Sequence, residues 1–214
     1  MANAVLELIV GPMKSGKSHL MITELDRFRF AQKNYPFSIF KPAADLRDNE
    51  LKSRTGLSLP STQVKTIQEV YEECDKTQYH IVAIDEFHMF PSEGFEETVA
   101  KMLARSRDTR YIFSGLDRDY KGDLMDNFVS LLRLPYNKIT TLNAICSECN
   151  IDDARDTIIK FENIPLNGGL DQVISEQAGS KLVFEPHCRT CFARAQKNAK
   201  SYNEISKEKT YSTE

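Results

Sequence analysis

Eight residues near the start of the chain, residues 11–18, carry the spacing G-x-x-x-x-G-K-S of a phosphate-binding loop. Its glycines let the backbone turn so tightly that successive N–H groups face one concavity, which can hold phosphate oxygens at a helix N-terminus. Within such a loop Lys17 would reach the β- and γ-phosphates, and the Ser18 hydroxyl would bind Mg²⁺. We therefore predict a nucleotide site formed by Gly11, Pro12, Met13, Lys14, Ser15, Gly16, Lys17 and Ser18.

The residues on either side of this loop favour the order strand, loop, helix that the motif requires. Residues 5–10 form a short apolar run, which is typical of a buried strand. After the loop, apolar residues recur at helical spacing, at Leu20, Met21, Leu25 and Phe28. The alternative is a glycine-rich turn that binds no ligand.

An acidic pair follows a second apolar run, residues 81–84. Asp85, at the end of this predicted strand, would hold Mg²⁺ directly or through water. Glu86 could face the γ-phosphate and take a proton from an attacking hydroxyl or water. Right-handed crossovers bring the carboxyl ends of parallel strands to one edge, so we expect Glu86 to lie beside the phosphate loop. The alternative is a pair of solvated acids at a strand end.

Two C-x-x-C pairs lie late in the chain, at Cys146 and Cys149 and at Cys188 and Cys191. Each pair can present two thiolates to one tetrahedral ion, and two pairs complete a Cys₄ zinc site. Since all four positions are then filled by protein, the zinc would be structural. The long segment between the pairs must leave the metal and return to it. The alternative is two redox-active or unpaired thiol pairs.

The remaining patterns predict an α/β fold. Strands alternate with helices, which favours a mostly parallel sheet covered by helices on both faces. We expect further strands at residues 38–40, 111–116 and 138–142, and helices at residues 66–76 and 94–105. The polar residues 43–60 read as a loop, and residues 193–214 as a loose polar tail.

Composition limits the class of protein. The 214 residues are 41% hydrophobic and 28% charged, with a net charge of −3, as in ordinary globular proteins. This charge argues against a large nucleic-acid interface. No apolar run approaches the roughly 20 residues of a membrane helix, and the N-terminus lacks the basic region of a signal peptide. We therefore expect a cytoplasmic protein, whose five cysteines serve metal or thiol chemistry rather than disulfides.

Taken together, these motifs resemble the type II thymidine kinases over about residues 5–192. The matching pieces are residues 11–18, residues 85–90, residues 115–120 and the two cysteine pairs. The resemblance implies a P-loop, RecA-like core over residues 1–143, a zinc-bound lasso domain over residues 144–192 that closes over the nucleoside, and the tail. It also implies ATP, Mg²⁺ and structural Zn²⁺ as cofactors, a homotetramer, feedback inhibition by thymidine triphosphate and a role in nucleotide salvage.

The resemblance also suggests roles for single residues. Glu86 matches the family's base, which deprotonates the nucleoside 5′-hydroxyl as it attacks the γ-phosphate. Asp45 and Arg47 resemble an Asp-x-Arg near the phosphates, and His88 falls among the nucleotide-binding positions. The nucleoside pocket would be formed by Met13, Met89, Leu116, Tyr120, Met125, Thr157 and Phe184.

Several positions depart from the family pattern. Lys14 replaces a usual Phe, His88 a usual Gln, and Phe184 a Tyr. Met89 and Met125 replace aromatic residues that help enclose the base in relatives. Methionine gives an adaptable wall with less stacking, so we expect selectivity that is looser or shifted toward deoxyuridine.

Two other functions fit parts of the pattern. In an ATPase that acts on nucleic acid, Glu86 would activate water instead of a sugar hydroxyl. In a catalytically silent nucleotide sensor, ATP would bind without forming a phosphorylated product. The net charge and the long-looped cysteine pairs count against the first, and Glu86 counts against the second.

Overall fold

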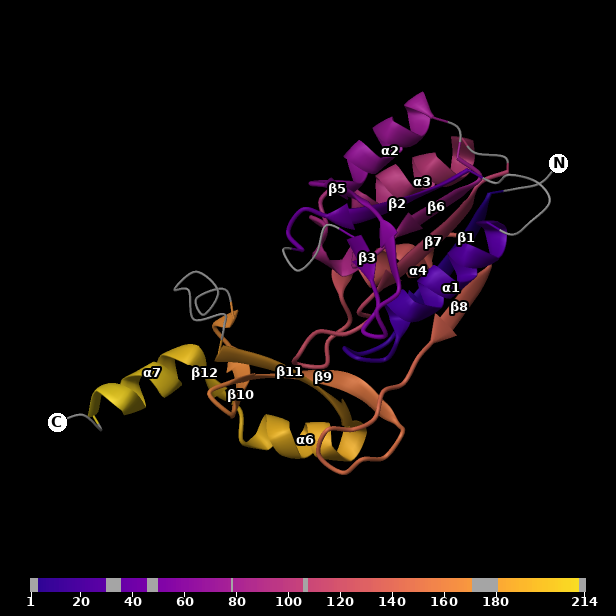
Figure 1. Ribbon diagram of the computed structural model, residues 1–214. Helices are drawn as coiled ribbons and strands as arrows, with labels where there is room; N and C mark the ends of the chain where they lie inside the picture. The colour runs from indigo at the N-terminus through magenta and orange to yellow at the C-terminus, as the bar shows by residue number, and fades with distance from the viewer. Residues whose placement is uncertain are drawn as a thin grey trace. The chain divides into compact units, whose positions relative to one another are not determined.

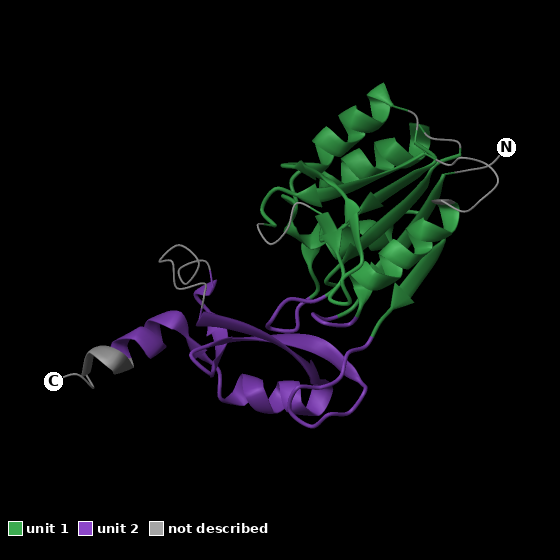
Figure 2. Ribbon diagram, viewed as in Figure 1, with its two compact units in different colours: residues 1–11, 16–117, 124–142 green, residues 12–15, 118–123, 143–214 purple. Residues whose placement is uncertain are grey.

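The computed structural model describes residues 4–29, 36–45, 50–77, 79–105, 108–170 and 181–211. The chain divides into two compact units, coloured separately in Figure 2. Unit 1 comprises residues 1–11, 16–117 and 124–142, and unit 2 comprises residues 12–15, 118–123 and 143–214.

A six-stranded sheet forms the centre of unit 1 (Figure 1). Its order is β5-β2-β6-β7-β1-β8, and every neighbouring pair is parallel. The strands are β1 (Val5–Val10), β2 (Phe37–Pro42), β5 (Thr62–Val64), β6 (Ile81–Ile84), β7 (Arg110–Gly115) and β8 (Lys138–Thr141). The predicted parallel α/β sheet is therefore confirmed.

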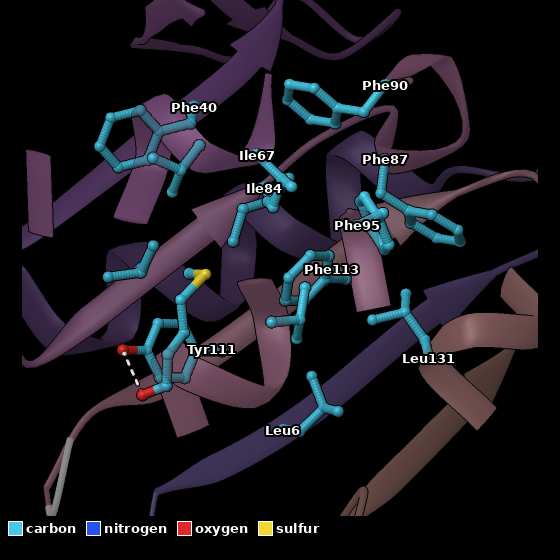
Figure 3. Packing of buried hydrophobic residues seen from close by; sticks show 14 of the residues in the cluster. Leu6, Phe40, Ile67, Ile84, Phe87, Phe90, Phe95, Tyr111, Phe113 and Leu131 are labelled. Atoms are coloured by element: carbon cyan, nitrogen blue, oxygen red, sulfur yellow. Dashed lines mark hydrogen bonds between the residues drawn. The ribbon is translucent and has the colours of Figure 1, made fainter. Parts of the chain in front are cut away.

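Two buried clusters cover the two faces of this sheet, because successive side chains of a strand point to opposite faces. In β6, Val82 and Ile84 belong to one cluster, and Ile81 and Ala83 belong to the other. Figure 3 shows the first cluster, in which Phe113 meets other aromatic rings edge to face. The elements that pack on the faces are α1 (Lys17–Arg29), α2 (Ile67–Lys76), α3 (Phe95–Arg105) and α4 (Asp126–Arg133).

The predicted loop at residues 43–60 contains a small hairpin instead. Strands β3 (Glu50–Lys52) and β4 (Ser58–Pro60) pair antiparallel, with Leu51 opposite Leu59. Both leucines are buried in the cluster that includes residues of α1. One apolar residue in each three-residue strand gives no readable period, although these two are enough to fix the hairpin on the core.

Unit 2 is built on a different, four-stranded sheet in the order β11-β9-β10-β12. Its elements are β9 (Ala154–Phe161), β10 (Ile164–Gly168), β11 (Leu182–Cys188), α6 (Arg189–Lys197), β12 (Lys200–Ser201) and α7 (Tyr202–Tyr211). Strand β9 pairs antiparallel with both β10 and β11. Glu162 and Asn163 both have positive φ in the two-residue turn between β9 and β10, as a type I′ hairpin turn requires.

The last part of unit 2 differs from the loose tail that we expected at residues 193–214. The segment carries the end of α6, then β12 and α7. The Ser201 N–H and hydroxyl both donate to the Glu204 carboxylate at 2.7 Å, a capping pair at the start of α7. Tyr202 and Ile205 are buried, and their packing explains why so polar a segment is ordered.

Among the described residues we find no helix with the length and apolar character needed to cross a bilayer.

Candidate functional site

The acidic pair Asp85 and Glu86 directly follows β6 and is buried in unit 1. Asp85 is 4% exposed and Glu86 is 7% exposed, and the Asp85 N–H donates to the Phe40 carbonyl of β2 at 3.0 Å. Glu86 has a left-handed backbone, with φ 51°, which costs a non-glycine residue about 1 kcal/mol and is frequent at functional sites. The pair lies at the carboxyl edge of the sheet, where open parallel sheets bind ligands.

The electrostatics of this pair favour a bound cation. Burial, followed by the charge of Glu86, raises the pKa of Asp85 from 3.8 to about 7. The Ser114 hydroxyl, Lys41 and Lys17 oppose this rise. Two carboxylates this close, out of water, do not both ionise readily unless a positive charge joins them. Carboxylate oxygens are also the ligands that Mg²⁺ prefers, so the donor set fits that ion.

Lys17 opens α1 at the same edge of the sheet, because β1 and β6 both pair in parallel with β7. Its Nζ donates to the Gly11 carbonyl at 2.9 Å, and the side chain is buried. The charge of Lys17 lowers the pKa of Asp85, so the two groups are close enough to interact. Unit 1 therefore brings together Lys17 and the acidic pair, and Ser18 follows in the first turn of α1.

A second buried cation, Lys41, is one that sequence reasoning missed. Its Nζ lies 2.9 Å from a carboxylate oxygen of Asp45 and donates to the Glu50 carbonyl at 3.1 Å. It also lowers the pKa of Asp85, so it belongs to the same charged group. The signal was a lysine at the carboxyl end of an apolar strand, directly before Pro42. Arg47, the predicted companion of Asp45, lies outside the described residues.

The backbone of residues 11–18 turns sharply. Gly11, Lys14 and Gly16 have φ values of 150°, 66° and 88°, and the Ser15 N–H donates to the Pro12 carbonyl at 3.4 Å. The first N–H groups of α1, which begins at Lys17, have no acceptor within the helix and can bind an anion. Residues 12–15 cluster with unit 2, whereas residues 11 and 16–18 cluster with unit 1.

The short 3₁₀ helix η1 (Phe87–Met89) positions the chain that follows Glu86. The Leu116 N–H donates to His88 Nδ1 at 3.2 Å, so Nδ1 is the acceptor and a neutral ring carries its proton on Nε2. The same Nδ1 lies 3.5 Å from a Glu86 oxygen. A Cβ atom at Gly115 would lie 2.8 Å from the Phe87 ring and 3.0 Å from His88 Nδ1. Close packing of η1 on β7 therefore requires glycine at position 115.

Asn127 of α4 is a second support for η1 that sequence reasoning missed. Its Nδ2 donates to the carbonyls of Phe87 and Phe90, at 3.0 and 2.8 Å. The asparagine is only 2% exposed, and buried amides are strong constraints when they bond to the backbone. No local pattern marked it, because its partners lie about 40 residues earlier in the chain.

The predicted nucleoside residues are divided between the two units. Those of unit 1 are Met89, Leu116 and Met125, and those of unit 2 are Met13, Tyr120, Thr157 and Phe184. Within unit 2 the Met13 N–H donates to Thr157 Oγ1 at 2.9 Å. Thr157 is opposite Pro186 in the β9–β11 pair. Since Phe184 is two residues from Pro186, Thr157 and Phe184 lie on the same face of the sheet.

All four cysteines of the predicted metal site meet in unit 2. Their Sγ atoms lie within 4.8 Å of one another, and those of Cys149 and Cys188 are 3.7 Å apart. Zinc–sulfur bonds of about 2.3 Å in a tetrahedron separate neighbouring sulfurs by about 3.8 Å. The spacing therefore fits a Cys₄ zinc centre. Cys74, the fifth cysteine, is on α2 in unit 1.

The thiols differ in their readiness to ionise. Burial opposes ionisation of Cys146, but backbone N–H groups of Cys188, Cys149 and Glu148 lower its pKa to about 6. Burial and the neighbouring thiols raise the pKa of Cys191 to about 12. Without a cation one thiolate can form but a second is repelled, whereas a zinc ion would stabilise all four thiolates.

Comparison with known proteins supports the family suggested by the motifs. The family model described as thymidine kinase matches residues 4–192. A thymidine kinase of Ureaplasma urealyticum is 38% identical over 152 residues, which cover 69% of this chain and 66% of that protein. One from Mesomycoplasma hyopneumoniae is 33% identical over 196 residues, 88% of this chain and 95% of that protein. The extent of the family match and these identities show that the chain belongs to the thymidine kinase family.

Proposed function

We propose that the protein transfers the γ-phosphate of ATP to the 5′-hydroxyl of thymidine and releases the 5′-monophosphate. The observation that carries this proposal is the buried acidic pair beside Lys17, at the carboxyl edge of a parallel sheet, in a member of the thymidine kinase family. Phosphoryl transfer needs alignment and charge neutralisation more than covalent chemistry. A buried group of two lysines and three carboxylates supplies suitable charges for both tasks.

In this proposal the backbone of residues 11–18 and Lys17 hold the phosphates, and Asp45 and Arg47 act as the Asp-x-Arg that the family resemblance implies. Ser18 and Asp85 would hold Mg²⁺, which supplies positive charge to the β- and γ-phosphates when bound. Glu86 accepts the proton of the nucleoside hydroxyl as it attacks. Its αL backbone and the packing of η1 fix the direction of its carboxylate.

Nucleoside selectivity follows from the side chains proposed to enclose the base. Met89 and Met125 stack less strongly than aromatic rings but adapt to different shapes. We therefore propose deoxyuridine as a second acceptor. The zinc-bound residues 144–192 would serve as the lasso that covers the nucleoside and excludes water, which otherwise competes for the phosphoryl group.

The cellular form of the enzyme is also proposed from the family resemblance. We propose a homotetramer in the cytoplasm, with ATP and a nucleoside as its partners and with structural zinc. The division into a kinase core, residues 1–143, and a lasso domain, residues 144–192, is supported by the two compact units, whose main boundary, between residues 142 and 143, falls one residue away.

A panel of nucleosides tests this function directly. Purified protein is incubated with ATP, Mg²⁺ and one of thymidine, deoxyuridine, deoxycytidine or deoxyadenosine, and monophosphate is measured by chromatography. We expect thymidine to give the most product, deoxyuridine to follow, and the other two to give little. The same reactions without nucleoside, with and without single-stranded DNA, measure background ADP release.

Two results would contradict the proposal. ADP release that rises with DNA but not with thymidine would favour an ATPase acting on nucleic acid. Tight ATP binding with neither ADP nor monophosphate would favour a nucleotide sensor.

A further inference from the structure

The segment after residue 192 lies beyond the family match, yet it is part of the fold of unit 2. Strand β12 extends the sheet by pairing in parallel with β10, through Lys200 opposite Leu166. The next residues form α7, whose first turn is capped by Ser201 and Glu204. Because the segment is so polar, its folding into a strand and a helix needs a structural explanation.

The cause is a small buried cluster in unit 2, which we call the α7 cluster. Its buried members are Ile159, Phe161, Leu166, Tyr202 and Ile205. The Tyr202 ring meets the Phe161 ring edge to face, with 5.3 Å between centroids, a geometry that adds to the gain from burial. Two residues of α7 thus complete the core that lies against β9 and β10.

The α7 cluster reaches residues proposed to bind the nucleoside. Tyr120 and Phe184, both partly buried, pack against it. Thr157 lies on the same strand as Ile159 and Phe161, two and four residues earlier, so its side chain is on the same face. All of these residues belong to unit 2. Side chains of α7 therefore support the face of the sheet that carries Thr157 and Phe184.

Helix α6 holds the Tyr120 loop by separate contacts. Gln196 Nε2 donates to the Tyr120 carbonyl at 2.7 Å. A Cβ atom at Gly122 would lie 3.1 Å from the Phe192 ring, so this loop packs closely on α6. Within the loop, Arg118 donates to the Gly122 carbonyl at 2.8 Å. The loop that carries Tyr120 is thereby fixed to the helix that begins after Cys188.

We propose that the segment after the family match positions the unit 2 residues proposed to bind the nucleoside, with Gln196, Tyr202 and Ile205 as positioning residues. The inference rests on the proposed function, because it concerns the binding of the nucleoside acceptor. Tyr202 and Ile205 pack on the face of the sheet that carries Thr157 and Phe184, and Gln196 fixes the Tyr120 loop. None of the three needs to touch the substrate to act. Displacing the groups that contact a substrate by about 1 Å can cost up to 100-fold in rate.

The test compares the effect of each substitution on the KM for thymidine with its effect on the KM for ATP. In Tyr202→Ala and Ile205→Ala, we expect the KM for thymidine to rise about tenfold while the KM for ATP stays within about twofold. Gln196→Ala should give a smaller rise of the same kind. Tyr202→Phe keeps the ring contact and should restore the wild-type KM. Asn203→Ala and Lys197→Ala, at exposed positions of α7 and α6, are the matched controls.

Hydrogen exchange supplies a readout that does not depend on turnover. In Tyr202→Ala we expect faster exchange at residues 118–123 and 154–168, and unchanged exchange at residues 81–84 in unit 1. The inference is overturned if the thymidine KM stays at the wild-type value, or if both KM values rise together. A wild-type protein that phosphorylates no nucleoside would instead refute the proposed function, and this inference with it; that result is visible before any variant is made.

Discussion

The two units solve the problem of holding a functional site in different ways. Unit 1 surrounds its charged groups with a doubly covered parallel sheet, so that Lys41, Asp45, Asp85 and Glu86 are all buried. Unit 2 has a smaller core of five buried apolar residues beside a separate cluster that includes three buried cysteines. The first site is held by hydrophobic packing around paired charges, whereas the second needs additional constraints.

This difference predicts which perturbations stay local. A small core buries a smaller share of its surface and relies on metals or other links. We therefore expect unit 2 to depend on zinc and on α7, and unit 1 to keep its fold and its buried acidic pair without either. The four experiments below measure that contrast, beginning with the one expected to have the largest effect.

Loss of zinc should produce the largest difference in behaviour between the two units. We expect Cys146→Ser, or removal of zinc by a chelator, to abolish thymidine phosphorylation, because structural zinc contributes on the order of 10 kcal/mol to folding. The fold of unit 1, measured by hydrogen exchange at residues 81–84, should persist. Cys74→Ser is the control, since burial raises the pKa of that thiol to about 11 and it stands apart from the four-cysteine cluster. Equal loss of protection from exchange at residues 81–84 would show that unit 1 does not stand by itself.

Glu86→Gln should remove turnover while leaving unit 1 folded. Glutamine has the size of glutamate but accepts no proton, so we expect kcat to fall about 1,000-fold. Unfolding by urea and the affinity for ATP with Mg²⁺ should change little. The exposed Glu93→Gln, a few residues later, is the matched control. A kcat near that of the wild type would refute the role of Glu86 as the base.

Lys41→Met measures how far unit 1 depends on its buried ion pair. Removing the lysine takes the ion pair with Lys41 away from the buried Asp45 carboxylate, and breaking such a buried pair typically costs about 3 kcal/mol. We expect this loss in the free energy of unfolding by urea, and recovery of most of it in the double variant Lys41→Met/Asp45→Leu. The exposed Lys65→Met should be close to wild type. A double variant no more stable than the single one would contradict the pairing.

The pH dependence of stability tests the raised pKa of Asp85. Folded protein without nucleotide or metal keeps a proton on Asp85 up to about pH 7, whereas the unfolded chain releases it near pH 3.8. The folded state therefore binds more protons between these values, and this residue makes stability fall as pH rises through the window. We expect Asp85→Asn to remove that part of the slope in urea unfolding from pH 4 to 8. Parallel curves for wild type and variant would contradict the raised pKa.

The two units also differ in which of their features could be predicted from the sequence. In unit 1 an apolar run that ends at Asp85 and Glu86 predicts a buried strand and a cation site, because pattern and chemistry are contiguous in the chain. Lys41 was missed because a lysine in a strand usually reaches solvent; here its ion pair with Asp45 keeps it buried. Asn127 acts on η1 from a distant helix, which no local pattern reveals.

In unit 2 the cysteine pairs were found from their spacing alone, and the structure places all four together. The sequence did not predict that residues 198–211 contain a strand and a helix. Tyr202 and Ile205 are two of the few apolar residues in a polar segment, and so short a pattern does not establish a period. Their importance depends on Phe161 and Leu166, which another part of the chain supplies. Tertiary packing therefore determined the structure of a segment that its composition had predicted to be a loose tail.

Gly115 has a consequence for how this enzyme can vary. A single added methyl group would overlap Phe87 and press on His88, one and two residues after the proposed base. In a saturation library selected for growth on exogenous thymidine, position 115 should therefore tolerate as little change as position 86, although it contributes no reactive atom. An inventory of the chemically active side chains would overlook it, and a survey of viable substitutions would not.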